Sequence, residues 1–335
     1  MALKYILILF IFACMLGCNN VKHNAKPIAF ESNGNLLDGI WVKPSSRISR
    51  STTLIFIHGD GAMDAKSKGF FTPIFNTLAD NGISSFSWHK PGISSSAGNW
   101  LAQSMVDRAQ EVRDAIKLIK QQNKNEKIGV IGFSQAGWVI PYLYDEPLLG
   151  FAIMVSPAVN WRQQSQYLTW QRLVREGLIE PEDEQALNTI EVLEQQVYAL
   201  IKGDFETYQH HPIHQHPFKG EPISDPQRFV FVQKNIDEDA TANLAKFGKP
   251  ILALFGDSDL NVDVEHSQQV YSELAKSGVN ITTHEFANAT HQLLKADEYL
   301  MLTSIQWYAK FSLESKDAFA PNFLNILIDW VKKNN

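Results

Sequence analysis

The chain has 335 residues, of which 44% are hydrophobic and 20% are charged, and its formal net charge is -6. These proportions are typical of a soluble globular protein with one large core or two modest ones. Acidic and basic residues are interspersed, so the composition lacks the basic footprint of a nucleic-acid-binding protein, and we expect no nucleic-acid partner.

The N-terminal residues predict an export signal. Lys4 precedes an apolar run at 5–16, which is too short to span a bilayer comfortably and is typical of a signal peptide. The run ends in Met-Leu-Gly-Cys at 15–18, which resembles a bacterial lipobox. This resemblance implies that residues 1–18 are the signal segment. It also implies that Cys18 is lipidated and holds the chain on the membrane, extracytoplasmically, and in the outer membrane of a Gram-negative cell. A plain secretory signal is the alternative.

The two cysteines bear on the chemistry that the mature chain can carry out. Cys14 and Cys18 both lie in the signal segment, so the mature chain would have no thiol for a disulfide or for nucleophilic catalysis. Residues 19–26 are polar and predict a short tether between the membrane and a domain that begins at residue 27.

Residues 27–157 predict the first part of an α/β core. Asn33-Gly34 between two apolar-rich runs is typical of a β-hairpin. Beyond it, apolar runs alternate with helical patterns, which indicates parallel strands and helices on both faces of a sheet. In chain order we expect strand 53–57, helix 70–78, strand 83–88, helix 105–119, a strand from Lys127, a helix from about Ala136 and strand 151–155.

The alternation stops at about residue 158 and resumes at 246. Because this insertion interrupts the sheet, we expect residues 158–245 to form a helical cap on the side where α/β sheets bind ligands. The predicted helices of the insertion are 161–175, 182–201 and 226–245, with a loop at 210–226. Residues 246–335 complete the core with strands 250–255 and 280–286 and helices 264–276 and 322–333.

A strand followed by Gly132-Phe-Ser134-Gln-Ala136-Gly137 is typical of a nucleophile elbow, a sharp turn that exposes one serine at the edge of a sheet. The turn strains the backbone of the serine, so its neighbours must be small. Gly132 meets this requirement, and Ala136 stands where a second glycine is usual. We therefore predict that Ser134 is the nucleophile, with an ordinary strand-to-helix turn as the alternative.

A serine nucleophile needs a base, and a base histidine needs an acid that sets its tautomer. Asp257 and Asp259 both follow strand 250–255 and are the candidates for the acid. His291 follows the next strand and is the preferred base. His284 lies within that strand and His266 within a helix, whereas a catalytic histidine is normally on a loop.

The oxyanion that forms during acyl transfer needs two backbone N–H donors. We expect one donor from Gln135, directly after the serine, and the other from Asp60. Asp60 lies in a His-Gly-Asp turn that follows strand 53–57. We expect the ring of His58 to hold this turn in shape.

These motifs together resemble the α/β-hydrolase superfamily, specifically its capped serine hydrolases of the esterase and serine-aminopeptidase type. The resemblance extends from about residue 27 to the C-terminus. It implies an α/β-hydrolase fold: a mostly parallel central sheet with helices on both faces and a helical cap insertion. It also implies the order Ser134, Asp259, His291, and its Gly-x-x-Asp spacing favours Asp259 over Asp257. The motifs are His58-Gly59, the 89–92 turn, Gly132–Gly137, Gly256–Asp259 and Ala289–His291. His89 stands where relatives usually have aspartate, which concerns the local loop geometry.

Two further groups of side chains have more than one interpretation. Trp138, Tyr142 and Trp161, with Trp170, either line an acyl pocket or pack in the core and cap. The histidines at 210, 211, 214 and 216 suit a transition metal, but no cysteine or ordered set of carboxylates accompanies them. We expect a flexible cap loop there, with no metal and no organic cofactor.

The sequence thus predicts an extracytoplasmic serine hydrolase that cleaves a carboxylic ester of a small or medium acyl group through a Ser134–His291–Asp259 triad. A peptidase or an acyltransferase on the same fold is the nearest alternative, because a fold and a triad do not determine the substrate. A catalytically silent binding lipoprotein is the alternative from another class.

Overall fold

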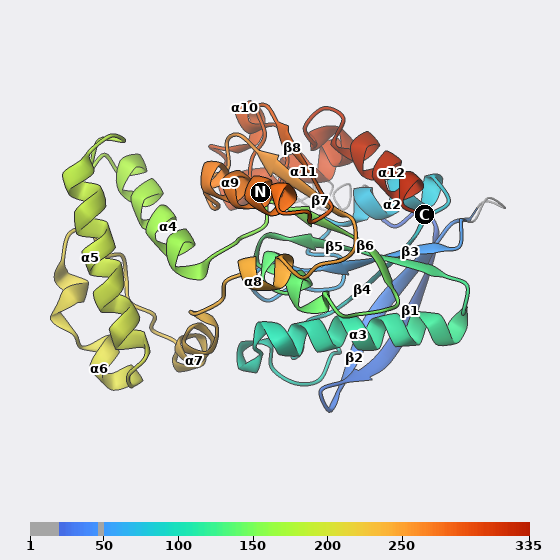
Figure 1. Cartoon of the computed structure of the whole chain (residues 1–335), viewed down its shortest axis with the longest axis horizontal. Coiled ribbons are helices and arrows are strands. Elements are labelled where there is room, and N and C mark those ends of the chain that lie inside the picture. Colours follow the sequence, from blue (N-terminus) through green and yellow to red (C-terminus); the bar gives the residue numbers. More distant parts are fainter. Residues whose placement is uncertain (1–19, 46–49) are drawn as a thin grey trace, which may run out of the picture.

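The computed structural model describes residues 20–45 and 50–335. Over this part of the chain, a central sheet has the strand order β1-β2-β4-β3-β5-β6-β7-β8 (Figure 1). β2 pairs antiparallel with β1 and β4, and the strands from β4 to β8 are parallel. The bounds are β1 Asn24–Ser32, β2 Asn35–Lys43, β3 Thr52–Ile57, β4 Ser84–Trp88, β5 Lys127–Phe133, β6 Leu149–Val155, β7 Ile251–Gly256 and β8 Ile281–Phe286.

The first two strands form the hairpin that the Asn-Gly pair predicts. Asn33 and Gly34 have φ of 50° and 75°, the left-handed values of a two-residue turn whose twist matches that of the strands. β1 begins at Asn24, and Lys26 pairs with Trp41. Residues 24–26, which we expected in the tether, therefore belong to the sheet.

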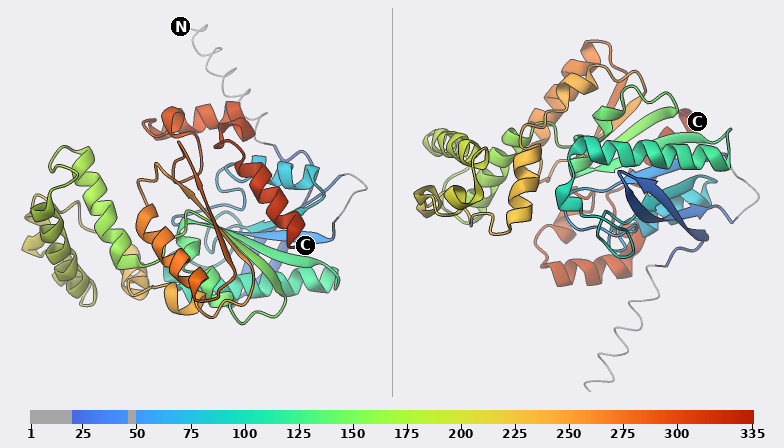
Figure 2. Two further views of the ribbon diagram at one scale, coloured as in Figure 1. Left: turned by 45° about the horizontal axis from the view of Figure 1, so that its top comes forward. Right: turned by 90° about the horizontal axis from the view of Figure 1, so that it is seen from below.

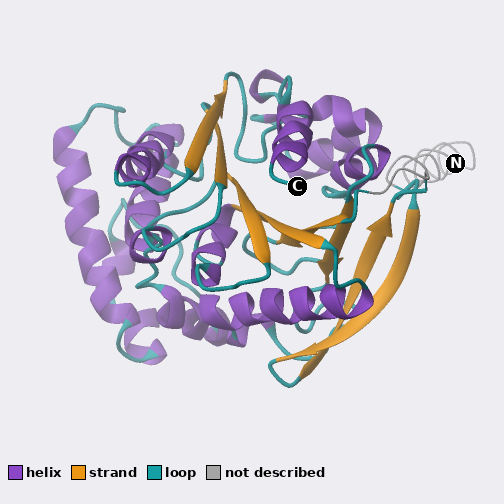
Figure 3. Cartoon of the chain, turned by 45° about the vertical axis from the view of Figure 1, so that its right-hand side comes forward, coloured by secondary structure: helices purple, strands orange, loops and turns teal. Residues whose placement is uncertain are grey.

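Helices cover both faces of the sheet, as predicted (Figure 3). The alternation along β3 sends Leu54 and Phe56 into one apolar layer and Ile55 and Ile57 into the other. α2 (Thr72–Asp80) and α12 (Phe323–Lys333) pack in the first layer. α3 (Met105–Gln122) and α9 (Val264–Lys276) pack in the second.

The helix expected from about Ala136 is not an α-helix. The elbow leads into two 3-10 segments, Ser134–Gly137 and Ile140–Leu143. Pro141 accounts for the difference, because a proline inside an α-helix lacks the N–H donor and its ring clashes with the preceding turn.

The insertion between β6 and β7 is helical and extends away from the sheet (Figure 2). Its two ends pair with each other, since Trp161 N–H donates to Glu238 O and Ala240 N–H to Val159 O, both at 2.9 Å. This pairing breaks the helix predicted at 226–245 into two. The helices are α4 Trp161–Arg175, α5 Glu184–Ile201, α6 Phe205–Gln209, α7 Pro226–Asn235 and α8 Thr241–Leu244, with a 3-10 turn at Pro212–Gln215.

The segment between β8 and α12 contains helices that the sequence pattern does not predict. They are α10 (Ala296–Tyr299), α11 (Ser304–Glu314) and a 3-10 turn (Ser315–Ala318). Thr303 begins α11 with a capping box to Gln306. In the described part of the chain, no helix has the length and apolarity needed to cross a bilayer.

Candidate active site

Ser134 has the strained backbone of a nucleophile elbow. Its φ is 53°, in the left-handed region that a non-glycine residue adopts only at a cost. A Cβ on Gly132 would lie 2.6 Å from the Cβ of Ala136, so glycine is required there. Ala136 therefore replaces the usual glycine without a clash only because Gly132 leaves it room.

Two further glycines allow other segments to approach the serine closely. A Cβ on Gly137 would lie 2.4 Å from the carbonyl oxygen of Ala158, where the insertion begins. A Cβ on Gly59 would lie 3.3 Å from the Cβ of Ser134. The elbow, the start of the insertion and the turn after β3 are thus packed against one another.

His291 and Asp259 form a direct pair after β8 and β7. Nδ1 of His291 lies 2.7 Å from Oδ2 of Asp259, and the carboxylate is wholly buried. The other carboxylate oxygen accepts N–H bonds from Asn261 at 2.7 Å and Val262 at 2.9 Å. A carboxylate acceptor places the ring proton on Nδ1, so in neutral His291 the Nε2 atom is left as a proton acceptor.

The other candidates for base and acid have different partners. The Asp257 carboxylate is exposed and accepts N–H bonds from Asn288 and Ala289, at 3.0 and 3.2 Å, which brace the loop that carries His291. His284 lies on the edge strand β8 with its ring against Phe286. His266 is in the first turn of α9.

Ser134 and His291 are not directly bonded in the described structure, in which no hydrogen bond joins the serine hydroxyl to the histidine ring. Catalytic hydrogen bonds in unliganded enzymes are often long and tighten only when substrate binds. The structure thus places the candidate acid Asp259 and the candidate base His291 in contact, and Ser134 directly after β5.

The turn after β3 is oriented by two buried cations. Lys90 Nζ donates to Gly59 O at 2.6 Å, and an Arg108 guanidinium nitrogen donates to His58 O. In a trans peptide the C=O and N–H groups point in opposite directions, so the hold on Gly59 O turns the Asp60 N–H away from Lys90. Within the described residues, this N–H has no protein acceptor. It is therefore available to a ligand.

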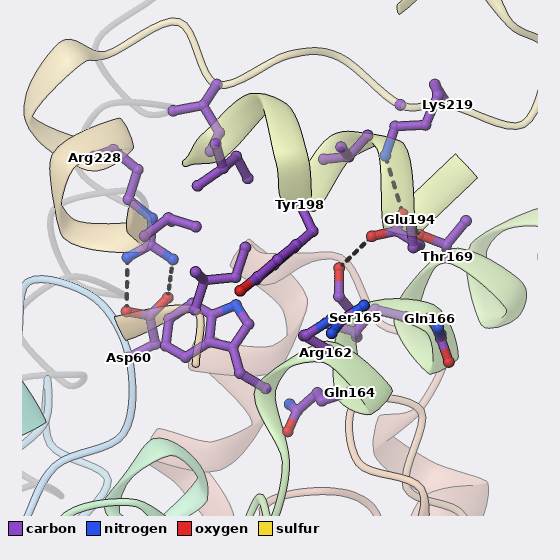
Figure 4. Close-up of a pocket in the computed structure, with 18 of the residues that line it drawn as sticks. Asp60, Arg162, Gln164, Ser165, Gln166, Thr169, Glu194, Tyr198, Lys219 and Arg228 are labelled. Carbon is purple, nitrogen blue, oxygen red and sulfur yellow. Dashed lines mark hydrogen bonds and ion pairs between the residues drawn. The ribbon is translucent and has the colours of Figure 1, made fainter. Parts of the chain in front are cut away.

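The side chains of Asp60 and Gln135 are bonded to each other and held by two arginines (Figure 4 shows the Asp60 end). Gln135 Nε2 donates to Asp60 Oδ1 at 3.1 Å, and Arg108 donates to Gln135 Oε1 at 2.6 Å. Arg228, from α7, donates to both oxygens of Asp60 at 2.9 and 2.6 Å. Burial alone would raise the pKa of Asp60, but the hydrogen bonds and charge of Arg228 outweigh it and lower that pKa.

Burial shifts the ionisation of the groups behind the turn. It lowers the pKa of Lys90 well below its usual value, with help from the charge of Arg108, and it lowers the pKa of Arg108 to about 10. Burial raises the pKa of Glu111, which accepts from the Trp88 indole, to about 7. Burial also holds the pKa of His58 well below its usual value. The His58 ring donates to Asp64 O, as expected of a structural histidine.

The sequence pattern does not predict this network. Lys90 lies in the 89–92 turn, and Arg108 stands within the apolar stripe of α3, which is the one local signal that points to it. Arg228 carries no such signal, since it is 168 residues from Asp60.

A cavity of about 460 Å³ lies between the elbow and the insertion. Ser134, Gln135 and Asp60 are among the residues that line it, and α4, α5 and α7 supply most of the others. Trp138 and Trp161 both line it and stack on each other with ring centroids 4.6 Å apart.

Two of the aromatic candidates lie elsewhere. The Tyr142 hydroxyl donates to Glu238 at 3.1 Å in the neck of the insertion, and Tyr142 is not among the residues that line this cavity. Trp170 packs within the insertion's own apolar cluster.

The four histidines of the insertion each bond to nearby backbone. The rings of His211 and His216 accept from the backbone N–H groups of the residues two positions later in the chain. The rings of His210 and His214 bond to backbone carbonyl oxygens. Groups of three or more potential metal ligands are absent from the described residues.

The chain matches the family described as serine aminopeptidase, S33, over residues 49–298, which include the elbow, the turn after β3 and the His291 loop. It belongs to this family. The S33 match makes it a serine hydrolase.

Solved structures share the fold of this S33-family hydrolase. The esterase Pf2001 of Pyrococcus furiosus is 14% identical, with a TM-score of 0.55 over 94% of this chain and 90% of that chain. Est1E from Butyrivibrio proteoclasticus with ferulic acid bound is 14% identical, with a TM-score of 0.54 over 91% of this chain and 96% of that chain. The acylaminoacyl peptidase of Pyrococcus horikoshii is 12% identical, with a TM-score of 0.51 over 92% of this chain and 41% of that chain. At such identities the likeness shows the fold, and it confirms the predicted α/β-hydrolase class. Among the curated proteins, none matches the chain.

Proposed function

We propose that this S33-family hydrolase cleaves carboxylic esters through an acyl-enzyme on Ser134. The observation that carries the proposal is the pairing of His291 Nδ1 with a buried carboxylate, which leaves Nε2 free to accept a proton. Ser134 Oγ attacks the carbonyl carbon while its proton passes to His291. The C–O bond to the alcohol then breaks as His291 returns the proton to the leaving oxygen, and water repeats the cycle to release the acid.

The oxyanion hole of this mechanism consists of the Asp60 and Gln135 N–H groups. Support comes from Lys90, whose bond to Gly59 O directs the Asp60 N–H away from the core, and from the packing of Gly59 against Ser134. Donors that are fixed before the reaction stabilise the developing charge without reorganisation. The buried cations behind the turn are thus positioning groups for the donors.

The substrate enters the cavity between the elbow and the insertion, and the insertion acts as a lid that selects substrate size. Support comes from the lining, which joins Ser134 to residues of α4, α5 and α7. Replacing residues 158–245 by a short Gly/Ser linker should broaden or abolish selectivity across a chain-length series of esters. Unchanged relative rates would contradict the lid role.

The family description favours one alternative, the cleavage of an amide next to a free amino group. A panel of esters, thioesters and aminoacyl amides, assayed with wild type and Ser134→Ala, separates the two. The ester proposal expects the highest kcat/KM on esters and loss of both turnover and fluorophosphonate labelling in Ser134→Ala. Faster cleavage of aminoacyl amides would favour the peptidase. Full ester hydrolysis by Ser134→Ala would contradict the mechanism.

We also propose that Cys18, which lies outside the described residues, carries a lipid anchor. Lys22 N–H donates to Asn76 Oδ1 at 2.8 Å, so the chain is attached to α2 within four residues of Cys18. An anchor there would hold the α2 side of the domain close to the membrane, and several acyl chains make such attachment stable. A Cys18→Ser form that is processed normally and still fractionates with membranes would refute this.

A further inference from the structure

A second cavity, of about 300 Å³, lies outside the insertion. Its walls come from the loop after β3, from the His291 loop and from the start of α11, and no residue of the insertion lines it. The lining residues are Met63, Ser67, Phe70, Gln292, Leu302, Ser304, Trp307 and Tyr308.

Three features connect the lining of this second cavity to the catalytic loops. Gln292 directly follows His291 in the chain. Met63 lies beside Gly61, the residue after Asp60, because a Cβ on that glycine would be 3.6 Å from the Met63 Cε. The Phe70 ring packs edge-on against Phe133, the residue before Ser134, at 5.9 Å between centroids. Residues that line the cavity thus lie next to His291 in the chain, next to the turn that carries Asp60, and against the residue before Ser134.

The two cavities differ in chemistry. The first is lined by charged side chains, among them Arg162, Glu194 and Lys219. The second contains no charged lining residue; five of its eight lining residues are apolar or aromatic, and the other three are serines and a glutamine. Next to it, Met301 and Ile305 are each 84% exposed, so its surroundings are also apolar. An apolar cavity of about 150 Å³ accommodates benzene, and the second cavity is larger.

We propose that the second cavity binds the alcohol part of the ester and that this part is an apolar chain or ring; the inference rests on the proposed ester hydrolysis. The two arms of an ester diverge from the carbonyl carbon, and the leaving oxygen must reach the proton on His291. The arm that departs thus lies on the side of His291, where the second cavity is. The acyl arm stays bonded to Ser134 and occupies the first cavity, which Ser134 lines.

Two ester series test this assignment, one that varies the alcohol at constant acyl group and one that varies the acyl group at constant alcohol. Wild type should gain roughly fourfold in kcat/KM for each methylene added to the alcohol until the cavity is full. Ser304→Phe fills the cavity from an exposed position and should abolish this gain, so that kcat/KM stays about the same as methylenes are added to the alcohol. Leu302→Ala, which enlarges it, should extend the gain to longer alcohols. Neither should change the acyl series.

The shared acyl-enzyme provides a second measurement, because the alcohol has left before deacylation. Ser304→Phe should leave the deacylation rate unchanged, yet lower the partition of that intermediate toward hexanol relative to water. Ile305→Phe, on the same turn of α11 but outside the lining, is the matched control and should resemble wild type.

The outcomes separate this inference from the proposed function. A change in the acyl series or in deacylation would assign the cavity to the acyl group and overturn the inference. If Ser304→Phe and Ile305→Phe have the same kcat/KM with every alcohol of the series, the cavity holds no part of the substrate. Both results leave hydrolysis by Ser134 intact, whereas ester turnover that survives Ser134→Ala refutes the proposed function itself.

Discussion

The two sides of Ser134 are held in place by different forces. On the oxyanion side, charged side chains from β4–α3 and from the insertion hold the turn after β3, through Lys90, Arg108 and Arg228. On the histidine side, backbone N–H groups hold the carboxylates of Asp257 and Asp259, and only Asp259 contacts the ring. Basic side chains therefore hold the turn with the proposed oxyanion donor, whereas local backbone holds the His291–Asp259 pair. Substitutions on the two sides should differ in how they divide between activity and stability.

Among the residues on the two sides of Ser134, the largest effect is expected from Asp259. Asp259→Asn should lower kcat by about 10³- to 10⁴-fold, because the histidine loses the acceptor that sets its tautomer and stabilises its cation. Asp257→Asn is the matched control, since its carboxylate braces the same loop without touching the ring, and it should lower Tm slightly with kcat nearly unchanged. Steady-state kinetics and thermal melts measure both. Equal losses of kcat would contradict the separation of the two aspartates.

On the oxyanion side, Lys90→Met should lower kcat by about 10²- to 10³-fold with little change in KM, because the Asp60 N–H would no longer be directed to the reacting oxygen. Tm should also fall, because the Gly59 carbonyl loses its donor and a buried polar group without a partner is destabilising. A boronic acid inhibitor should bind the variant more weakly than wild type. Unchanged kcat and inhibitor affinity would remove Lys90 from the positioning of the hole.

A smaller effect is expected from Arg228→Met, which should lower kcat about tenfold because Asp60 loses its bidentate partner. Arg228→Lys should recover part of the loss, since lysine keeps the positive charge but cannot donate to both carboxylate oxygens in the planar geometry of a guanidinium. Lys234→Met removes another contact between α7 and the core, to Ala102 O, and serves as the control. Equal losses of kcat in Arg228→Met and Lys234→Met would mean that the packing of α7 on the core, and not the bond to Asp60, accounts for the effect.

A separate effect, on stability rather than on kcat, concerns its pH dependence. Burial raises the pKa of Glu111 to about 7 from an ordinary value of 4.5, so the folded state binds this proton more tightly than the unfolded state. The stability from this group is complete below pH 4.5 and is lost as pH rises through 7, by roughly 3 kcal/mol at most. Glu111→Gln should flatten this part of the stability profile in urea unfolding. A profile like that of wild type would contradict the shift.

Local signals were reliable where the neighbouring residues decide the conformation. Asn33-Gly34 predicts the hairpin, because these two residues tolerate positive φ. The helix expected at 161–175 is α4 with the same bounds, since Asn160 caps it. The predictions failed where distant contacts intervene. The helix predicted at 226–245 breaks after Asn235, because the following residues pair with the start of the insertion.

For the site, the sequence by itself determined which residue types stand at the strand ends: Ser134 on a turn of small residues, acids after β7 and His291 after β8. The tertiary structure decided how they meet. It selected Asp259 rather than Asp257 as the partner of His291, and it brought Arg228 to Asp60 across 168 positions. Periodicity and turn chemistry act between neighbours in the chain and are legible there. Ion pairs, buried charges and cavities arise only when remote segments pack together, and no local pattern encodes which segments those are.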